Sequence, residues 1–106
     1  MKSIFMDFKL ENGKVIQLTL NFARLYKVKN KRKDLYERFM NSISDKKNYD
    51  PIFSSLTVLY VAYLCANSEK LEDESIMSEE EFMENVPQSF KIINEMAAEL
   101  ISPKKK

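Results

Sequence analysis

The stretch that decides the fold is IFMDFKLENGKVIQLTLNF, residues 4–22, and it contains the only glycine of the chain, Gly13. Two runs that alternate apolar and polar residues flank this glycine. One side of the first run carries Ile4, Met6, Phe8 and Leu10, and one side of the second carries Ile16, Leu18 and Leu20. A period of two is typical of half-buried strands, and Asn12-Gly13 between the runs is a hairpin signal. The sequence therefore predicts a β-hairpin at about residues 3–21 in front of helices.

The register of this hairpin follows from which residues must share a face. A two-residue loop at Asn12-Gly13 sets Phe8 opposite Gln17 and places the two apolar sets on different faces. A three-residue loop over residues 11–13 sets Phe8 opposite Ile16 and places both sets on one face. Such a loop is usually a type I turn closed by a residue in the left-handed region, where glycine meets no steric penalty. We therefore predict the three-residue loop, with Gly13 at its closing position.

After the hairpin, the apolar residues recur at helical spacing, and this pattern is interrupted once. Asn21 can cap a helix that begins near Phe22 and continues its apolar face with Leu25 and Tyr26. The pattern lapses over residues 29–33 and then resumes at helical spacing with Leu35, Tyr36, Phe39, Met40 and Ile43. One bent helix or two short helices fit this segment, and we favour two.

The next helix is predicted to be the most buried element of the chain. Asp50 at the cap position and Pro51 in the first turn mark its start. From there to about Asn67 the sequence is apolar on nearly all sides of a helix. A helix without a polar face belongs at the centre of a bundle.

Two shorter helices are predicted after an acidic loop over residues 67–77. Ser78 with Glu81 forms a capping box, which opens a helix that ends near Asn85. Pro87 starts a last helix, whose inward residues are predicted to be Phe90, Ile93, Met96, Ala97, Leu100 and Ile101. The expected fold class is α+β, mainly α, with the hairpin packed on a bundle of four or five helices.

The composition indicates one small domain. The chain has 106 residues, of which 44% are hydrophobic and 31% are charged, and its net charge is +1. This length suffices for one core, which we assign to residues 1–103, with a basic tail at 104–106. The longest apolar run, residues 56–66, is too short to span a bilayer, and a single cysteine suits a reducing compartment. We therefore expect a cytoplasmic protein with no membrane partner.

The sequence offers no group suited to catalysis or to a cofactor. Histidine, the commonest general base and metal ligand, is absent. Cys65 has no histidine partner, and its apolar neighbours predict a small buried hydrophobe rather than a nucleophile. One acidic group could supply oxygen ligands to a cation, and it comprises Glu69, Glu72, Asp73 and Glu74. It lacks the pattern of a calcium loop. We expect no enzyme and no catalytic, cofactor-binding or metal-binding residues.

A basic run is the candidate for contact with nucleic acid, and it comprises Lys27, Lys29, Lys31, Arg32 and Lys33. Tyr26 and Tyr36 flank this run and could stack on bases. Asp34, Glu37 and the acidic loop offset its charge, so the domain is not basic as a whole. A small nucleic-acid-binding regulator that uses residues 27–33 is therefore an alternative function, and the charge balance argues against it.

Four strings carry a resemblance to a known family. They are LYKVKNKRK with DLYE behind it (25–37), LTVLYVAYLCAN (56–67), MSEEEF (77–82) and LISPKKK (100–106). In this order, they resemble the small tail assembly chaperones of long-tailed phages and prophages of Gram-positive bacteria. The resemblance covers almost the whole chain, and the string at 56–67 and the PKKK end are its specific parts.

The resemblance implies a role in assembly and no active site. Such chaperones bind the long tape measure protein before the tail tube forms around it, keep that protein soluble and help to recruit tube subunits. The implied partners are therefore the tape measure protein and the tail tube protein, in the cytosol of the bacterial host, with no place in the mature virion. A structural tail connector protein, which would remain in the particle, is an alternative role in the same tail.

The lysines at the end of the sequence allow two interpretations. In many relatives, ribosomal frameshifting near the end of the gene makes a longer second product. Lys104 to Lys106 can be encoded by a run of adenines on which tRNAs slip, or they can simply form a soluble tail. Both interpretations stay open at the level of the protein sequence.

A partner surface is predicted around the short acidic helix. Binding a long apolar helix needs an exposed apolar groove or a flexible, methionine-rich surface. We predict that Phe82 and Met83 belong to that surface, and the alternative is that Phe82 packs into the core of its own domain. Tyr60 and Tyr63 are candidates for the same surface, because buried tyrosine hydroxyls need partners and can point toward an edge or interface. The alternative is that both belong to the core, since they lie on the helix that must be buried.

The hairpin offers a second interface. A two-stranded hairpin is only marginally stable alone and must pack on helices. Its outer edges then remain unpaired and can add to the strands of another subunit. We therefore expect a homo-oligomer.

Overall fold

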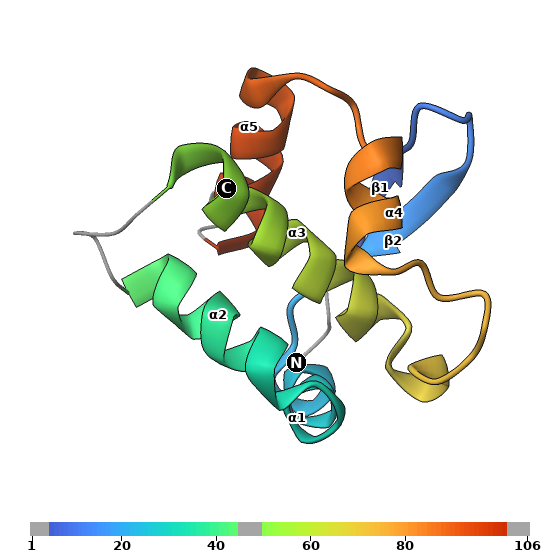
Figure 1. The fold of residues 1–106 in the computed structure, drawn as a ribbon, viewed down its shortest axis with the longest axis vertical. Coiled ribbons are helices and arrows are strands. Elements are labelled where there is room, and N and C mark those ends of the chain that lie inside the picture. The colour runs from blue at the N-terminus through green and yellow to red at the C-terminus, as the bar shows by residue number, and fades with distance from the viewer. Residues whose placement is uncertain (1–4, 45–49, 102–106) are drawn as a thin grey trace.

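The computed structural model describes residues 5–44 and 50–101. It confirms an α+β, mainly α fold, in which an N-terminal hairpin packs on helices (Figure 1). The elements in chain order are β1 (Met6–Lys9), β2 (Val15–Leu18), α1 (Phe22–Lys31), α2 (Lys33–Ser44), α3 (Pro51–Ala66), a 3-10 turn η1 (Ser68–Lys70), α4 (Glu79–Asn85) and α5 (Phe90–Ile101). The lysines of residues 104–106 lie outside the described residues.

The hairpin has the register predicted for a three-residue loop. β1 and β2 are antiparallel, and Phe8 lies opposite Ile16 and Met6 opposite Leu18. Gly13 has a φ of 90°, in the region that favours glycine, and its N–H donates to the Leu10 carbonyl at 3.0 Å. On the shared face, Phe8, Leu10, Ile16 and Leu18 are buried, and Met6 and Leu20 are partly buried against the same core. The further pair predicted at Ile4 lies outside the described residues.

The segment after the hairpin forms two helices, as predicted. The side chain of Asn21 caps α1 by accepting a hydrogen bond from the Arg24 N–H at 3.2 Å. The chain breaks at Arg32, whose φ of −135° and ψ of 67° are not helical, and α2 then begins. Both helices pack on α3 and on each other along one side of the molecule (Figure 1).

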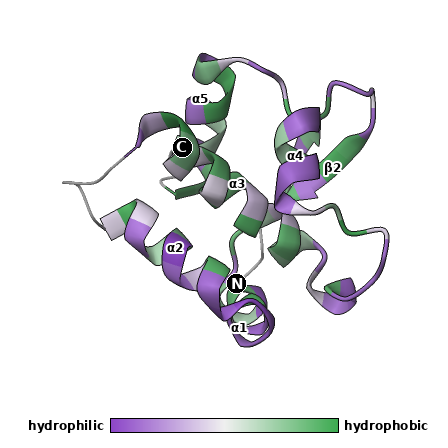
Figure 2. Ribbon diagram, in the orientation of Figure 1, coloured by the Kyte–Doolittle hydropathy of each residue, from purple (hydrophilic) through white to green (hydrophobic). Residues whose placement is uncertain are grey.

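The helix α3 runs through the centre of the molecule and is its most buried element. Asp50 caps it by accepting hydrogen bonds from the N–H groups of Ile52 and Phe53, and Pro51 occupies the first turn. Every residue from 54 to 65 is buried, because α1, α2, α4, α5 and β2 surround the helix. Hydrophilic residues gather on the outer helices α2 and α4 (Figure 2).

The last helix begins later than predicted. Ser78 caps α4 as expected, but α5 starts at Phe90 rather than at Pro87, since the Gln88 side chain donates to the carbonyls of Met83 and Val86 and closes the end of α4. The prediction that Phe90 and Ile101 turn inward is wrong, because each lies at an end of the helix and they are 72% and 45% exposed. The inward stripe consists of Ile93, Ala97 and Leu100, and Met96 is partly buried against the same core.

Candidate functional site

The structure places three of the four predicted partner residues in the core of the domain. Phe82 is 0%, Tyr60 1% and Tyr63 5% exposed. The Phe82 ring centroid lies 5.3 Å from that of Tyr60 and 5.6 Å from that of Tyr63, so α4 packs on α3 through an aromatic junction made by these three residues. The hypothesis that Phe82 lies on a partner surface is therefore wrong, because Phe82 packs into the core of its own domain, as the alternative predicts, and Tyr60 and Tyr63 belong to the same core. Met83 is partly buried against the same core.

Both tyrosine hydroxyls find partners inside the domain. The Tyr60 hydroxyl donates to the Met77 carbonyl at 2.7 Å, and the Met77 N–H donates to the Tyr63 hydroxyl oxygen at 2.9 Å. Burial raises the pKa of Tyr60, and the neighbouring Arg32 opposes this shift. These bonds tie α3 to the segment that leads into α4, so neither hydroxyl needs an interface to satisfy it.

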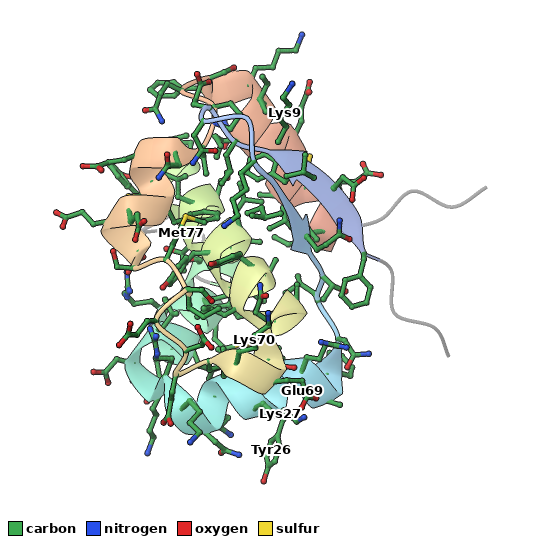
Figure 3. The ribbon with its side chains drawn as sticks, turned by 90° about the vertical axis from the view of Figure 1, so that its right-hand side faces the viewer. Lys9, Tyr26, Lys27, Glu69, Lys70 and Met77 are labelled. Atoms are coloured by element: carbon green, nitrogen blue, oxygen red, sulfur yellow. The ribbon has the colours of Figure 1, made fainter. Side chains whose placement is uncertain are left out.

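Two lysines of the basic run, Lys27 and Lys31, form ion pairs with the acidic loop, and both side chains remain about half exposed. Lys27 Nζ lies 3.1 Å from a Glu69 carboxylate oxygen (Figure 3), and Lys31 Nζ lies 3.1 Å from one of Glu72. Lys29 lies over the Tyr36 ring, with its Nζ 5.4 Å from the ring centroid. Exposed ion pairs of this kind contribute only about 0–1 kcal/mol, but they divide the positive surface that nucleic acid requires. Lys33 is exposed at the start of α2.

The remaining candidates for chemistry are the Cys65 thiol and the acidic side chains. Burial raises the pKa of the Cys65 thiol to about 12, so this cysteine carries almost no thiolate near neutral pH. Within residues 5–44 and 50–101, no three His, Cys, Asp or Glu side chains come together as a metal site would require. None of the helices in this part of the chain is long and apolar enough to cross a membrane.

An apolar groove lies between α1, α2 and the end of α5. Its volume is about 610 Å³. Several of its side chains are exposed, above all Phe22 at 90% and Tyr26 at 64%. The described residues that line it are Leu20, Asn21, Phe22, Leu25, Tyr26, Lys29, Tyr36, Phe39, Met40, Ile43, Leu100 and Ile101.

The groove forms because α1 and α2 each carry more apolar surface than α3 can cover. In α1 only Val28 is buried, whereas Phe22 and Tyr26 point away from the core. In α2 the buried residues are Leu35 and Phe39, and a second stripe beside them faces the groove with Tyr36, Met40 and Ile43. Apolar patches of this kind on a protein surface commonly mark interaction sites.

The sequence contained a signal for this groove that the prediction did not use. The apolar residues of α2 span a stripe wider than a single packing face needs, since Tyr36 and Met40 follow directly after Leu35 and Phe39. Such width predicts two contact surfaces on one helix. Which of the two is open depends on the packing of α1 and α5, which the spacing alone does not specify.

Comparisons with protein-family models, with curated protein sequences and with solved structures each gave no match. The interpretation of the groove therefore comes from its own residues. It combines large apolar side chains, two aromatic rings with hydroxyl groups and a methionine, and Lys29 is the one charged residue among the described residues that line it. This set suits a protein segment with an apolar stripe.

Proposed function

We propose that this protein is a non-enzymatic assembly chaperone of a phage tail. It holds an amphipathic helical segment of the tape measure protein in the apolar groove and assists the polymerisation of the tail tube. The observation that carries this proposal is the exposure of Phe22 and Tyr26 beside Met40 in one continuous groove. The resemblance of the sequence strings to tail assembly chaperones agrees with a role of this kind.

The chemistry of the groove favours a helix with an apolar stripe and an acidic flank. A helix laid in such a groove buries its apolar residues at positions three and four apart. Lys29 at the rim has a cation–π contact with Tyr36 but no recorded ion pair among the described residues, so it can receive a carboxylate.

A binding experiment with matched variants tests the proposal. The proposal predicts a long helical reading frame beside this gene, and the partner in the experiment is its product, the tape measure protein, co-expressed and captured with the tagged protein. We expect Phe22→Ser with Tyr26→Ser to weaken capture at least about tenfold, because burying each such side chain contributes about 1.5–3 kcal/mol. Phe90→Ser is the control, since Phe90 is also exposed but does not line the groove.

The outcomes separate the groove from the rest of the surface. Failure of the unmodified protein to bind, or equal binding by the groove variant, would overturn the proposal. An equal loss of capture in the Phe90→Ser control would show that the partner does not bind specifically in the groove, and it would overturn the assigned site.

The place of action separates a chaperone from a structural connector. A chaperone works in the host cytosol and leaves before the tail is complete, so mass spectrometry of purified particles should detect the tape measure protein and not this chain. Stoichiometric presence of the chain in the particles would support the connector instead.

A further inference from the structure

The backbone of β1 presents an open edge. Residues of an antiparallel pair alternate between those that exchange hydrogen bonds and those whose N–H and C=O groups point away from the partner strand. The Leu10 N–H donates to the Lys14 carbonyl at 2.8 Å, which places Leu10, and with it Phe8 and Met6, in the bonded set. The backbone groups of Asp7 and Lys9 therefore point away from β2.

The two edges of the hairpin have different surroundings. On the β2 side, the Thr19 N–H donates to the Ala62 carbonyl at 3.2 Å, and β2 packs on α3. On the β1 side, the Glu11 N–H donates to the Asn85 carbonyl at 2.7 Å and closes the turn. Figure 3 shows the hairpin lying across this side of the molecule, where Lys9 is labelled. Among the described residues, the backbone from Asp7 to Lys9 makes no hydrogen bond to an element other than β2.

We propose that this edge pairs with β1 of a second copy of the chain. The two β1 strands run antiparallel about a two-fold axis at Phe8, so that Asp7 of each copy lies opposite Lys9 of the other. The outward backbone groups of these two residues then exchange hydrogen bonds across the axis, and the two hairpins form one continuous sheet. The apolar groove takes no part in this contact, so the inference is independent of the proposed function.

The charges on β1 favour one register of the pairing, and they favour a second copy of the chain as the partner at this edge. A two-fold interface must be complementary to itself, and opposite charges at Asp7 and Lys9 meet this condition. A shift of the register in one direction places Asp7 opposite Asp7, and a shift in the other places Lys9 opposite Lys9. Like charges directly opposite each other destabilise a strand pair, whereas opposite charges stabilise it.

The size of the edge predicts a reversible association. β1 contains four residues, so the pairing surface is small and its formation depends on concentration. Sedimentation over a wide range of protein concentration should show the apparent mass rise from 12.5 kDa toward twice that value. A mass that stays at that of one chain throughout would overturn the proposal.

Charge exchange tests the register directly. Asp7→Lys alone and Lys9→Asp alone each place like charges opposite each other, and we expect each variant to remain monomeric. An equimolar mixture of the two variants restores opposite charges at both pairs, so we expect the mixture to dimerise like the unmodified chain. Dimers of either variant alone, or no dimer in the mixture, would overturn this register.

Two controls separate pairing from folding. Asp7 also accepts a hydrogen bond from the Gln17 side chain within the hairpin, and Gln17→Ala removes this bond without a change of charge at the edge. Lys14→Asp changes the charge of the hairpin away from β1. Both controls should dimerise normally, and circular dichroism should show the helical content of the unmodified chain for every variant. A control that abolishes dimers while it stays folded would overturn the assignment to the β1 edge.

Discussion

The aromatic junction between α3 and α4 and the apolar groove between α1, α2 and α5 contain similar side chains, yet only the junction is closed to solvent. Tyr60, Tyr63 and Phe82 are nearly fully buried, whereas Phe22 is 90% and Tyr26 64% exposed. In the junction, two elements meet face to face and the hydroxyl groups bond to the backbone. In the groove, the chain breaks at Arg32 between α1 and α2, and apolar side chains of both helices face solvent.

This difference shows that residue type alone does not identify a contact surface. A short helix with one large aromatic residue resembles a detachable segment in the sequence, but Phe82 anchors it fully. A helix with a regular apolar face resembles a core helix, but α1 buries only Val28. The decisive quantity is how much apolar surface the neighbouring elements can cover.

The largest expected contrast is in thiol reactivity, which probes how well each region excludes solvent. At pH 8, burial keeps Cys65 protonated, since its pKa is raised from 9.0 to about 12. Its labelling in the folded protein should be about a thousandfold slower than in the unfolded chain. In the variant Tyr26→Cys, the new thiol of the groove should react fast while Cys65 reacts slowly, as absorbance with a chromogenic disulfide would show. Equal rates for the two thiols would contradict the comparison.

The same pKa shift predicts the direction of the pH dependence. Because the folded pKa of Cys65 is raised, the unfolded chain loses this proton first as the pH increases. The folded state then binds more protons than the unfolded state between about pH 9 and 12, so its stability falls with rising pH in that window. The variant Cys65→Ala should lack this component in denaturant titrations.

Truncation of one phenylalanine in each region should separate the two most clearly in stability. Phe82→Ala should lower the free energy of unfolding by about 3–5 kcal/mol, because it removes a fully buried ring and leaves a cavity. Phe22→Ala should change it by less than about 0.5 kcal/mol, because the ring is already exposed. Urea denaturation of both variants measures this, and similar losses would contradict the assignment of core and groove.

Removal of one hydroxyl in each region should have a smaller effect. Tyr63→Phe leaves the buried Met77 N–H without its partner, which should cost about 1–3 kcal/mol. Tyr26→Phe removes an exposed hydroxyl and should change stability by less than about 0.5 kcal/mol. Thermal and urea unfolding provide the measurement, and a neutral Tyr63→Phe would show that another donor or water replaces the bond.

The smallest effect is expected at the ion pair that borders the junction. The Arg38 guanidinium forms two hydrogen bonds with the Glu79 carboxylate at 3.1 and 2.7 Å, and this pairing raises the pKa of Arg38. Since the Arg38 side chain is 55% exposed, Arg38→Ala should destabilise the fold by only about 0.2–1 kcal/mol. The loss should shrink at high salt, and a larger, salt-independent loss would indicate packing by the arginine stem.

Local chemistry predicted the elements and most of their ends. The parity of the apolar residues and Gly13 predicted the hairpin register, and the caps at Asn21, Asp50 and Ser78 are all present. These features depend on groups within a few residues of each other, so a linear pattern contains them. The start of α5 was mispredicted because the side chain of Gln88 extends the end of α4 before a new helix begins.

What the sequence by itself determined is the list of elements, the strand register and the buried place of α3, since a helix with no polar face has only one stable location. Only the tertiary structure decided which aromatic residues are closed to solvent and which line a groove. Exposure depends on the angles at which whole helices meet, and those angles result from contacts between residues far apart in the chain. An apolar stripe indicates that burial of a surface is favourable, but only the neighbouring elements determine whether anything covers it.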